Sequence, residues 1–284
     1  MKYAWIQEHG GQFPVLVMCR CLQVSRSGYY GWRGREPSER ERRRQQIAAA
    51  AAESHRASHG IYGFRKVYED LRAAGWGCCA ETVRRCLAEQ GLFSVVKRKF
   101  VATTDSDHDH PVAPNLLDRD FSAAGANQKW AGDITYVATE EGWLYLAAIM
   151  DLYSRKIVGW SMSSRIDTSL VDSALTMAME KRCPDEGLLH HSDRGGQYAS
   201  GDYQQRLSRH GITCSMSRRG DCYDNACVES FFGSLKTEWI RGHRYASREA
   251  ARTEVFKYIE LFYNRQRRHA SLGYLSPDAY EATN

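Results

Sequence analysis

The chain has 284 residues, a hydrophobic content of 43% and a formal net charge of +5, which fits a globular protein with room for two domains. It contains no apolar run of about 18 residues, which excludes a membrane-spanning helix, and no apolar leader of the secretory type. Its nine cysteines form no C-x-x-C pair, so we expect reduced thiols and a cytoplasmic location rather than a disulfide framework.

The charge is distributed unevenly along the chain. Residues 1–100 contain 18 Lys and Arg against 9 Asp and Glu, residues 101–235 are net negative, and residues 236–284 are net positive. Basic segments on both sides of an acidic one indicate polyanion-binding arms around a centre that gathers carboxylates. Because carboxylates beside a polyanion surface repel it, bound cations are expected at that centre.

The first hundred residues are predicted to be helical. Two short segments come first, and three helices follow; the ranges are 13–20, 22–30, 39–52, 64–72 and 81–90. In the second segment Ser25, Arg26 and Ser27 are expected to face outward, as in a recognition helix, with the following aromatic residues packing. We therefore expect a helix-turn-helix-like segment in residues 1–52 and a second DNA-binding unit of this kind in residues 53–100.

Basic side chains on these helices are the candidate DNA contacts, because Lys and Arg neutralise backbone phosphates. They are Arg42, Arg43, Arg65, Lys66, Arg84 and Arg85. The alternative is that the charged helix faces are merely solvated and the helical pairs are simple hairpins.

Residues 101–124 are polar and are predicted to be a linker, and although His108 and His110 alternate with aspartates there, the segment offers no scaffold for a metal site. The pattern then changes to short strands and helices. Strands are predicted at 130–138, 143–150, 156–162, 188–191 and 212–216, and helices at 168–181, 203–210, 222–240 and 247–264. This order predicts an α/β domain in residues 125–284, with a mixed five-stranded sheet flanked by helices.

Three carboxylates stand where such a domain would bring them together. Asp133 lies inside the first strand, where a charge is costly unless it is compensated. Asp193 follows the fourth strand at a glycine turn, the edge at which open α/β sheets bind ligands, and Glu229 lies on a helix. Three such groups can hold a pair of Mg²⁺ ions for phosphoryl transfer. Lys236, two helical turns after Glu229, is expected to meet a phosphate nearby.

Four motifs give the chain a family resemblance: D-I-T-Y, H-S-D-R-G-G-Q-Y, D-N-A-x-x-E-S-F-F-x-x-L-K-x-E and Y-N-R-Q-R-R-H-A-S-L-G-Y-L-S-P. In this order they resemble the OrfB-type transposases of the IS-three group of insertion sequences, which carry a retroviral-integrase-like catalytic core with an RNase H-like fold. The 35 residues between Asp193 and Glu229 match the spacing of the D-D-35-E pattern.

The resemblance implies a function and a set of residues. Asp133, Asp193 and Glu229 match the catalytic, metal-binding acids, and Lys236 matches the basic residue that follows the glutamate by seven. It implies two Mg²⁺ ions, for which Mn²⁺ substitutes, and cleavage of double-stranded DNA at the element ends followed by transfer of a 3′-hydroxyl to target DNA. A circular intermediate is also implied.

Partners follow from the same resemblance. Joining two element ends requires at least a dimer, so a homo-oligomer is expected in the DNA complex. The family also implies a companion, OrfA, with a further helix-turn-helix and a leucine zipper. This chain has no long heptad repeat, so we expect it to be the downstream of two reading frames. The implied location is the bacterial cytoplasm, associated with the nucleoid.

Two other functions remain open from the sequence. A non-catalytic helix-turn-helix regulator would use residues 1–100 and leave the aligned acids without a role. An RNase H-like nuclease would use the acids but would not need basic segments at both ends. Substituting Asp133 by Asn separates the regulator from both enzymes, and comparing RNA–DNA hybrids with paired DNA ends separates the enzymes from each other.

Several single residues also have two interpretations. Asp151 is a further metal ligand or, as we favour, a turn-forming carboxylate, and Asp221 and Asp224 fit the capping of the helix that carries Glu229. The four residues His55, His59, Cys78 and Cys79 only faintly resemble the zinc module of retroviral integrases, because adjacent cysteines do not readily bind one metal.

Three further groups of candidate residues are the C-terminal segment, two histidines of the fourth predicted strand and four tryptophans. The segment 263–269 mixes aromatic residues with arginines, which favours phosphate contacts by Arg265 and Arg268 over a merely solvated helix end. His190 and His191 should face opposite sides of the sheet, with His191 able to approach the metals. Trp130, Trp143, Trp160 and Trp239 are expected to pack in the core or between helices.

Overall fold

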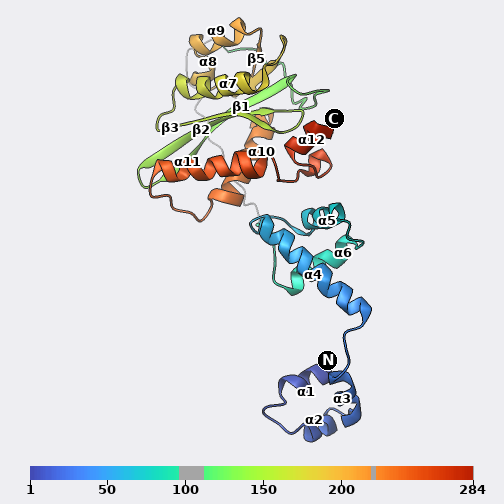
Figure 1. The fold of residues 1–284 in the computed structure, drawn as a ribbon. Helices are drawn as coiled ribbons and strands as arrows, with labels where there is room; N and C mark the ends of the chain where they lie inside the picture. The colour runs from blue at the N-terminus through green and yellow to red at the C-terminus, as the bar shows by residue number, and fades with distance from the viewer. Residues whose placement is uncertain (96–111, 219–221, 284) are drawn as a thin grey trace.

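The computed structural model describes residues 1–95, 112–218 and 222–283 (Figure 1). Two small helical units precede an α/β core, which confirms the predicted fold class. His108, His110 and Asp221 lie outside the described residues, as do residues 101–111 of the predicted linker. No helix in the described part of the chain is long and apolar enough to cross a membrane.

The first helical unit comprises α1 (Lys2–Glu8), α2 (Val15–Cys21) and α3 (Arg26–Arg33). Ser25 begins α3 by accepting a hydrogen bond from the Gly28 amide at 2.9 Å, and it is exposed together with Arg26 and Ser27, as predicted. Tyr29 is buried. Helix α1 was not predicted, because its N-terminus has no side-chain cap and it buries only one residue.

The second unit comprises α4 (Glu39–Ala57), α5 (Phe64–Ala73) and α6 (Ala80–Glu89). Ser38 caps α4 by accepting a hydrogen bond from the Glu41 amide at 3.2 Å. The helix continues five residues past its predicted end at 52, because Ile47, Ala51 and His55 form one buried stripe at a spacing of four. The His55 ring bonds to the carbonyl oxygen of Tyr62 at 2.9 Å.

The core is a mixed sheet of five strands in the order β3-β2-β1-β4-β5. The strands are β1 (Lys129–Thr139), β2 (Gly142–Asp151), β3 (Ile157–Ser163), β4 (Leu189–Ser192) and β5 (Thr213–Met216). The first three strands form an antiparallel meander, and β4 and β5 run parallel to β1. Strand β1 is therefore central, paired on both edges.

Helices cover both faces of the sheet (Figure 1). On one face lie α7 (Thr168–Arg182), α8 (Gly196–Ala199) and α9 (Gly201–Arg209), and on the other lie α10 (Ala226–Leu235) and α11 (Arg248–Phe256). Alternate residues of β2 supply the two cores: Ala147 and Ile149 pack on the α7 side, and Leu146 and Ala148 pack on the α10 side. Gly159 allows α7 a close approach, since an added Cβ would lie 2.2 Å from the Ala174 carbonyl oxygen.

Both predicted long helices are present, and each changes form near its end. Helix α10 is preceded by a 3₁₀ turn, η1 (Cys222–Asn225), and continues as a π-helix, η2 (Lys236–Ile240). Helix α11 likewise continues as a π-helix, η3 (Lys257–Tyr263). Two further short elements, η4 (Ala270–Leu272) and α12 (Pro277–Thr283), follow, and neither was predicted.

Tryptophan positions agree only partly with the prediction. Trp130 is completely buried, and Trp239 stacks on Phe262 with ring centroids 5.6 Å apart. Trp143 is 50% exposed and its ring meets that of Tyr136 edge-on, so its prediction as a core residue was wrong. The reason is its place near the end of the β1–β2 hairpin, where the first two residues of β2 are exposed.

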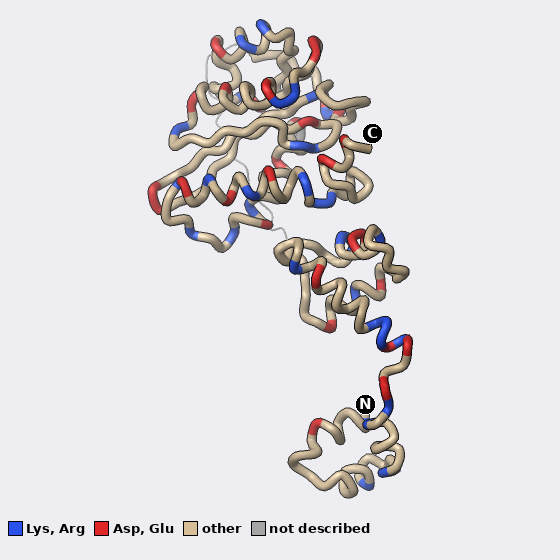
Figure 2. Tube along the Cα trace, viewed as in Figure 1, with Lys and Arg blue, Asp and Glu red and all other residues tan. Residues whose placement is uncertain are grey.

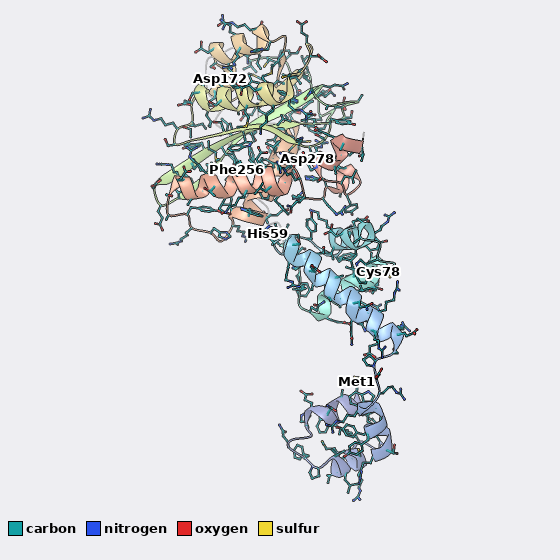
Figure 3. The ribbon with its side chains drawn as sticks, viewed as in Figure 1. Met1, His59, Cys78, Asp172, Phe256 and Asp278 are labelled. Carbon is teal, nitrogen blue, oxygen red and sulfur yellow. The ribbon has the colours of Figure 1, made fainter. Side chains whose placement is uncertain are left out.

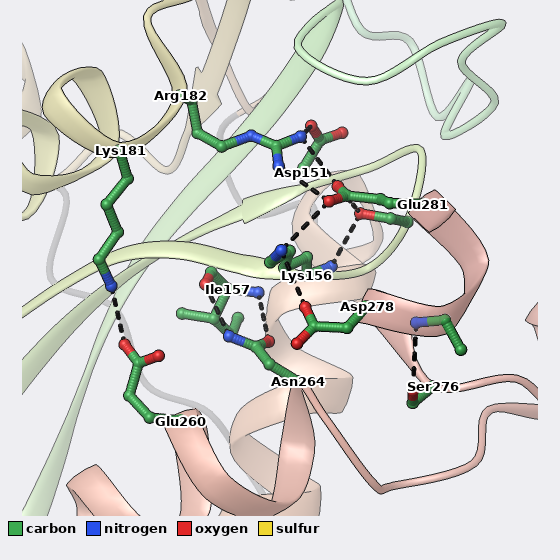
Figure 4. A network of polar contacts seen from close by, with 12 residues as sticks. Asp151, Lys156, Ile157, Lys181, Arg182, Glu260, Asn264, Ser276, Asp278 and Glu281 are labelled. Carbon is green, nitrogen blue, oxygen red and sulfur yellow. Dashed lines mark hydrogen bonds and ion pairs between the residues drawn. The ribbon is translucent and has the colours of Figure 1, made fainter. Parts of the chain in front are cut away.

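The end of the chain is fastened to the sheet by polar contacts (Figure 4). The buried Asn264 amide bonds to the N–H and the C=O of Ile157 at 3.0 and 2.9 Å, which satisfies the free edge of β3. On α12, Glu281 pairs with Arg182 at 2.8 Å and with Lys156 at 3.2 Å. These contacts hold the C-terminal segment against α7 and β3.

The second helical unit docks on this C-terminal segment. The Tyr62 hydroxyl donates to the Gln266 carbonyl oxygen at 3.0 Å and accepts from the Arg268 amide at 2.8 Å. His59, which Figure 3 places where α4 reaches the core, meets the Trp239 ring edge-on at 4.7 Å between centroids. The last residues of the chain therefore link the helical unit to the sheet.

Candidate active site

The pairing of two strands in the sheet places Asp133 and Asp193 side by side. Strand β1 pairs in parallel with β4 through the partners Trp130–His190 and Ala131–His191. Continuing this register by two residues sets Asp133 beside Asp193, which directly follows the end of β4. Each carboxylate is held by a backbone amide: Asp133 accepts from Ile134 at 2.7 Å, and Asp193 accepts from Gly195 at 2.9 Å.

Helix α10 brings the third acid to the same place. The buried Asn225 side chain donates to the carbonyl oxygen of Gly132 at 3.1 Å, which anchors the start of α10 beside Asp133. Glu229 lies four residues further on and so shares the helix face of Asn225. Lys236, seven residues after Glu229, places its ammonium group 4.6 Å from the centre of the Tyr136 ring.

The charges of these four groups act on one another. Burial raises the pKa of Asp133 well above its usual value, and the charges of Asp193 and Glu229 raise it further, while Lys236 opposes them. Burial also raises the pKa of Glu229 and lowers that of Lys236. Negative charge at Asp133 is therefore poorly compensated by the protein alone, and a bound cation would offset it.

The oxygen donors fit a hard divalent cation such as Mg²⁺, which takes few protein carboxylates and fills its remaining positions with water and phosphate. Across the described ranges, no three His, Cys, Asp or Glu side chains are grouped so that they could hold a metal ion by themselves. The protein thus supplies ligands of the right chemistry without a complete metal cage.

The two strand histidines have structural roles on opposite sides of the sheet. His190 bonds to the Tyr203 hydroxyl at 2.9 Å, and burial lowers its pKa to about 3. His191 uses both ring nitrogens, with Ser215 at 2.9 Å and Ser217 at 3.1 Å, and burial lowers its pKa to about 4. Both rings are therefore neutral near pH 7, and His191 is occupied by serine hydroxyls.

The interpretation of Asp151 as a turn-forming carboxylate is confirmed. It is fully buried and accepts hydrogen bonds from the amides of Asn127 and Tyr153 at 2.8 and 3.0 Å. Arg182 adds an ion pair at 3.2 Å. Because these partners occupy its carboxylate, Asp151 has a structural role at the end of β2.

The predicted capping role of Asp224 was wrong. The Asp224 carboxylate is fully buried and accepts from the Arg218 amide at 2.9 Å, the Asn115 side chain at 2.8 Å and Arg119 at 3.3 Å. The residue that precedes α10 is Asn225, whose side chain makes no capping bond. Asp224 therefore ties the nearby Arg218 and one distant segment, 115–119, to the start of α10. Local sequence cannot reveal the distant partners, which lie 109 and 105 residues away.

The candidate DNA contacts of the helical unit fall into two groups. Arg43 donates to the carbonyl oxygen of Gly77 at 3.0 Å and so holds α4 to the turn before α6. Arg42 pairs with Glu36, and Arg84 and Arg85 pair with Glu81 at 2.7 and 2.8 Å. The side chains of Arg42, Arg84 and Arg85 remain at least half exposed, so these ion pairs are weak. Figure 2 shows the basic residues at the start of α4.

The remaining basic candidates lie nearer the core. Arg65 is exposed beside the Phe64 ring, and the Lys66 ammonium group lies 5.0 Å from the centre of the Tyr62 ring. Arg265 is also exposed. Arg268 is largely committed to the protein, because it forms an ion pair with Asp70 and donates to the carbonyl oxygen of Tyr274 at 2.8 Å.

Sequence reasoning missed two residues that shape the site. Asn225 anchors α10 on β1, and its position four residues before Glu229 was the available signal. Glu238, two residues after Lys236, receives a bidentate contact from Arg267 at 2.6 and 2.7 Å. No local pattern indicates that pair, because its partners are 29 residues apart.

Models of known protein families match the second helical unit and the core. Residues 123–222 and 210–277 match models of the integrase core domain, and residues 41–100 match a model of an HTH-like domain. Among solved structures, the HTLV-2 integrase catalytic core domain in complex with magnesium gives a TM-score of 0.41 at 15% identity, over 56% of this chain and 98% of that chain. The simian T-cell lymphotropic virus intasome in complex with PP2A regulatory subunit B56 gamma gives 0.43 at 18% identity, over 75% and 69%.

Sequence relatives match over nearly the whole length. The chain is 48% identical to "Transposase InsF for insertion sequence IS3A" of Escherichia coli (strain K12), with 100% of this chain and 99% of that protein covered. It is 45% identical to "Insertion element IS600 uncharacterized 31 kDa protein" of Shigella sonnei, over 93% and 97%. By this similarity, and by its integrase core and HTH-like domain, the chain belongs to the InsF family of insertion-sequence transposases.

Proposed function

We propose that Asp133, Asp193 and Glu229 are the catalytic acids of a DNA transposase that cleaves strands at the ends of an insertion sequence and joins them to target DNA. The observation that carries this proposal is the position of Asp133 on the central strand, where the charges of Asp193 and Glu229 raise its pKa. Carboxylates whose charges act on one another in this way suit phosphoryl transfer, in which bound cations neutralise negative charge.

The three acids would hold two Mg²⁺ ions, with Mn²⁺ able to substitute. When bound, such ions activate the attacking water or 3′-hydroxyl and neutralise the leaving oxygen. The protein itself contributes positioning: Asn225 fixes α10 on β1, and the amides of Ile134 and Gly195 orient the first two carboxylates. Lys236, whose ammonium is electrostatically linked to Asp133, would contact a phosphate beside the reacting one.

Double-stranded DNA would lie along the exposed basic side chains of the helical unit and the chain end, which are Arg42, Arg65, Arg84, Arg85 and Arg265. Their exposed positions support phosphate contacts. Arg43 and Arg268 would act indirectly, by holding elements in place. Because two ends must be joined, we propose that at least two chains assemble on the DNA; an OrfA-type companion would supply further end recognition.

The test is strand transfer with purified full-length protein, pre-cut labelled element-end DNA and Mg²⁺ or Mn²⁺, with the companion protein added in a parallel reaction. Asp133→Asn, Asp193→Asn and Glu229→Gln should each lower the rate by at least about a thousandfold while DNA affinity is retained. Asp202→Asn, at an exposed position on α9, is the matched control and should leave the rate unchanged.

The outcomes separate the candidate functions. Joined products that depend on all three acids support the transposase. Tight DNA binding without any joined product would favour a non-catalytic regulator, and cleavage of RNA–DNA hybrids instead of paired DNA ends would favour a nuclease. Full strand transfer by Asp193→Asn would remove that residue from the site.

A further inference from the structure

A cavity of about 320 Å³ lies behind α10, on the side away from the catalytic acids. From α10 it is lined by Cys227, Ser230 and Ser234. At 100° per residue these positions face away from Glu229 and Lys236, which share the opposite side of the helix. The cavity is therefore separate from the carboxylate site, although both are built on one helix.

The cavity contains a positive charge that lacks a counter-charge. Arg155, half-buried in the β2–β3 connection, donates a hydrogen bond to the Cys227 sulfur, and in residues 1–95, 112–218 and 222–283 it forms no ion pair with a carboxylate. The other lining arginine, Arg267, is paired with Glu238 at 2.6 Å, and no Asp or Glu lines the cavity. A half-buried guanidinium bonded only to a thiol is poorly compensated and favours an anion.

The electrostatics of a neighbouring ring agree with this charge. Burial and the charges of Arg267, Lys66 and Arg155 together lower the pKa of His269, at the cavity wall, to about 2. The ring is therefore neutral, and the positive potential comes from the guanidinium groups.

The backbone supports the placement of Arg155. Its φ angle is +60°, in the left-handed region that non-glycine residues rarely adopt. Such strain persists where the surrounding structure fixes it, often at a ligand site. Asp151 supplies part of that fixation, because its carboxylate holds the Tyr153 amide at 3.0 Å at the start of the same connection.

The remaining walls indicate what kind of anion would fit. Phe121 and Tyr263 provide aromatic surface, and Ser230 and Ser271 provide hydroxyl groups. A guanidinium with hydroxyls suits a phosphate, and aromatic walls suit a flat base. We propose that this cavity binds a single nucleotide, with its phosphate at Arg155 and its base against Phe121 and Tyr263. The source is either a free nucleotide or one extruded from bound DNA.

The first test is calorimetric titration of the full chain in EDTA, which keeps metal-dependent binding at the acids out of the measurement. The probes are dAMP, deoxyadenosine and inorganic phosphate. We expect saturable binding of dAMP, at least about tenfold tighter than either part alone. Arg155→Gln should weaken dAMP binding by about tenfold or more, whereas Arg165→Gln, at an exposed position, should not.

A second readout uses the unaltered chain and does not depend on a variant that folds. dAMP should slow the alkylation of Cys227, measured by mass spectrometry of its peptide, and leave the exposed Cys183 unaffected. A DNA duplex with one unpaired nucleotide that protects Cys227 better than a fully paired duplex would identify DNA as the source. Absence of saturable dAMP binding, or binding unchanged in Arg155→Gln, would overturn the proposal, and neither result bears on the strand-transfer test.

Discussion

The buried ion pair between Glu238 and Arg267 offers a strong test of how α10 and its extension η2 are held in place. Glu238 lies on η2, two residues after Lys236, and Arg267 reaches it with two hydrogen bonds of 2.6 and 2.7 Å. The two side chains are 9% and 11% exposed, so the pair is almost completely desolvated. Glu238→Gln would leave the Arg267 guanidinium buried without a counter-charge, and breaking such a pair costs about 3–5 kcal/mol.

This cost is measurable against the whole stability of the fold, which for native proteins is about 5–15 kcal/mol. The melting temperature of Glu238→Gln should fall by on the order of 10 °C, and the midpoint of urea unfolding should fall with it. Glu81→Gln breaks a pair that is about half exposed and should cost less than about 1 kcal/mol. The double variant Glu238→Leu with Arg267→Met should recover much of the loss, because neither charge stays buried alone.

The contribution of the Glu238–Arg267 pair to stability should also depend on pH. Burial alone would raise the pKa of Glu238, but the hydrogen bonds and charge of Arg267 outweigh it and leave the pKa below its usual value. The stability that the pair contributes is therefore present above the unfolded pKa of about 4.3 and is lost as the pH falls through the folded value. A loss in Glu238→Gln below about 1 kcal/mol at pH 7, or one that grows in acid, would refute the reasoning.

Three further outcomes are expected. Asn264→Leu should lower the free energy of unfolding by about 2–4 kcal/mol in urea titration, because both backbone groups of Ile157 lose their partner inside the protein; a neutral effect would mean that water replaces the amide. Gly159→Ala should cost about 1–3 kcal/mol or more in melting experiments, because its Cβ would meet the Ala174 carbonyl oxygen at 2.2 Å. Arg268→Gln should speed amide hydrogen exchange in α5, because it removes the ion pair with Asp70, and should leave exchange in β1 and β2 unchanged. Exchange rates in α5 equal to those of the unaltered protein would show that this contact does not protect the helix.

The sequence predicted the α/β core well, because its physical signals are local. β-Branched and aromatic residues mark β1, a continuous apolar run marks β2, and glycine and charged turns separate the strands. Asp193 could also be predicted as a ligand at a strand end, because that prediction needs only the short segment around it. These features were readable without knowing which strands are neighbours.

Long-range pairing was not readable. Arg268 looked like a phosphate contact, yet its partner Asp70 lies 198 residues away, and the partners of Asp224 come from segments up to 109 residues away. The π-helical ends of α10 and α11 were equally hidden, since packing and not propensity selects them. A sequence gives the chemistry of each side chain, whereas the fold decides which of them remain available to a ligand.

The docking of the second helical unit on the chain end has a consequence for synthesis on the ribosome. The hydrogen bond between Tyr62 and Gln266 cannot form until Gln266 has been synthesised, 204 residues later. At about 5–20 residues per second, that delay is on the order of 10–40 s. Throughout it, α4, α5 and α6 are complete and unattached to the core. During synthesis the second helical unit is therefore exposed to solvent and to other molecules before the C-terminal segment exists to dock it on the core.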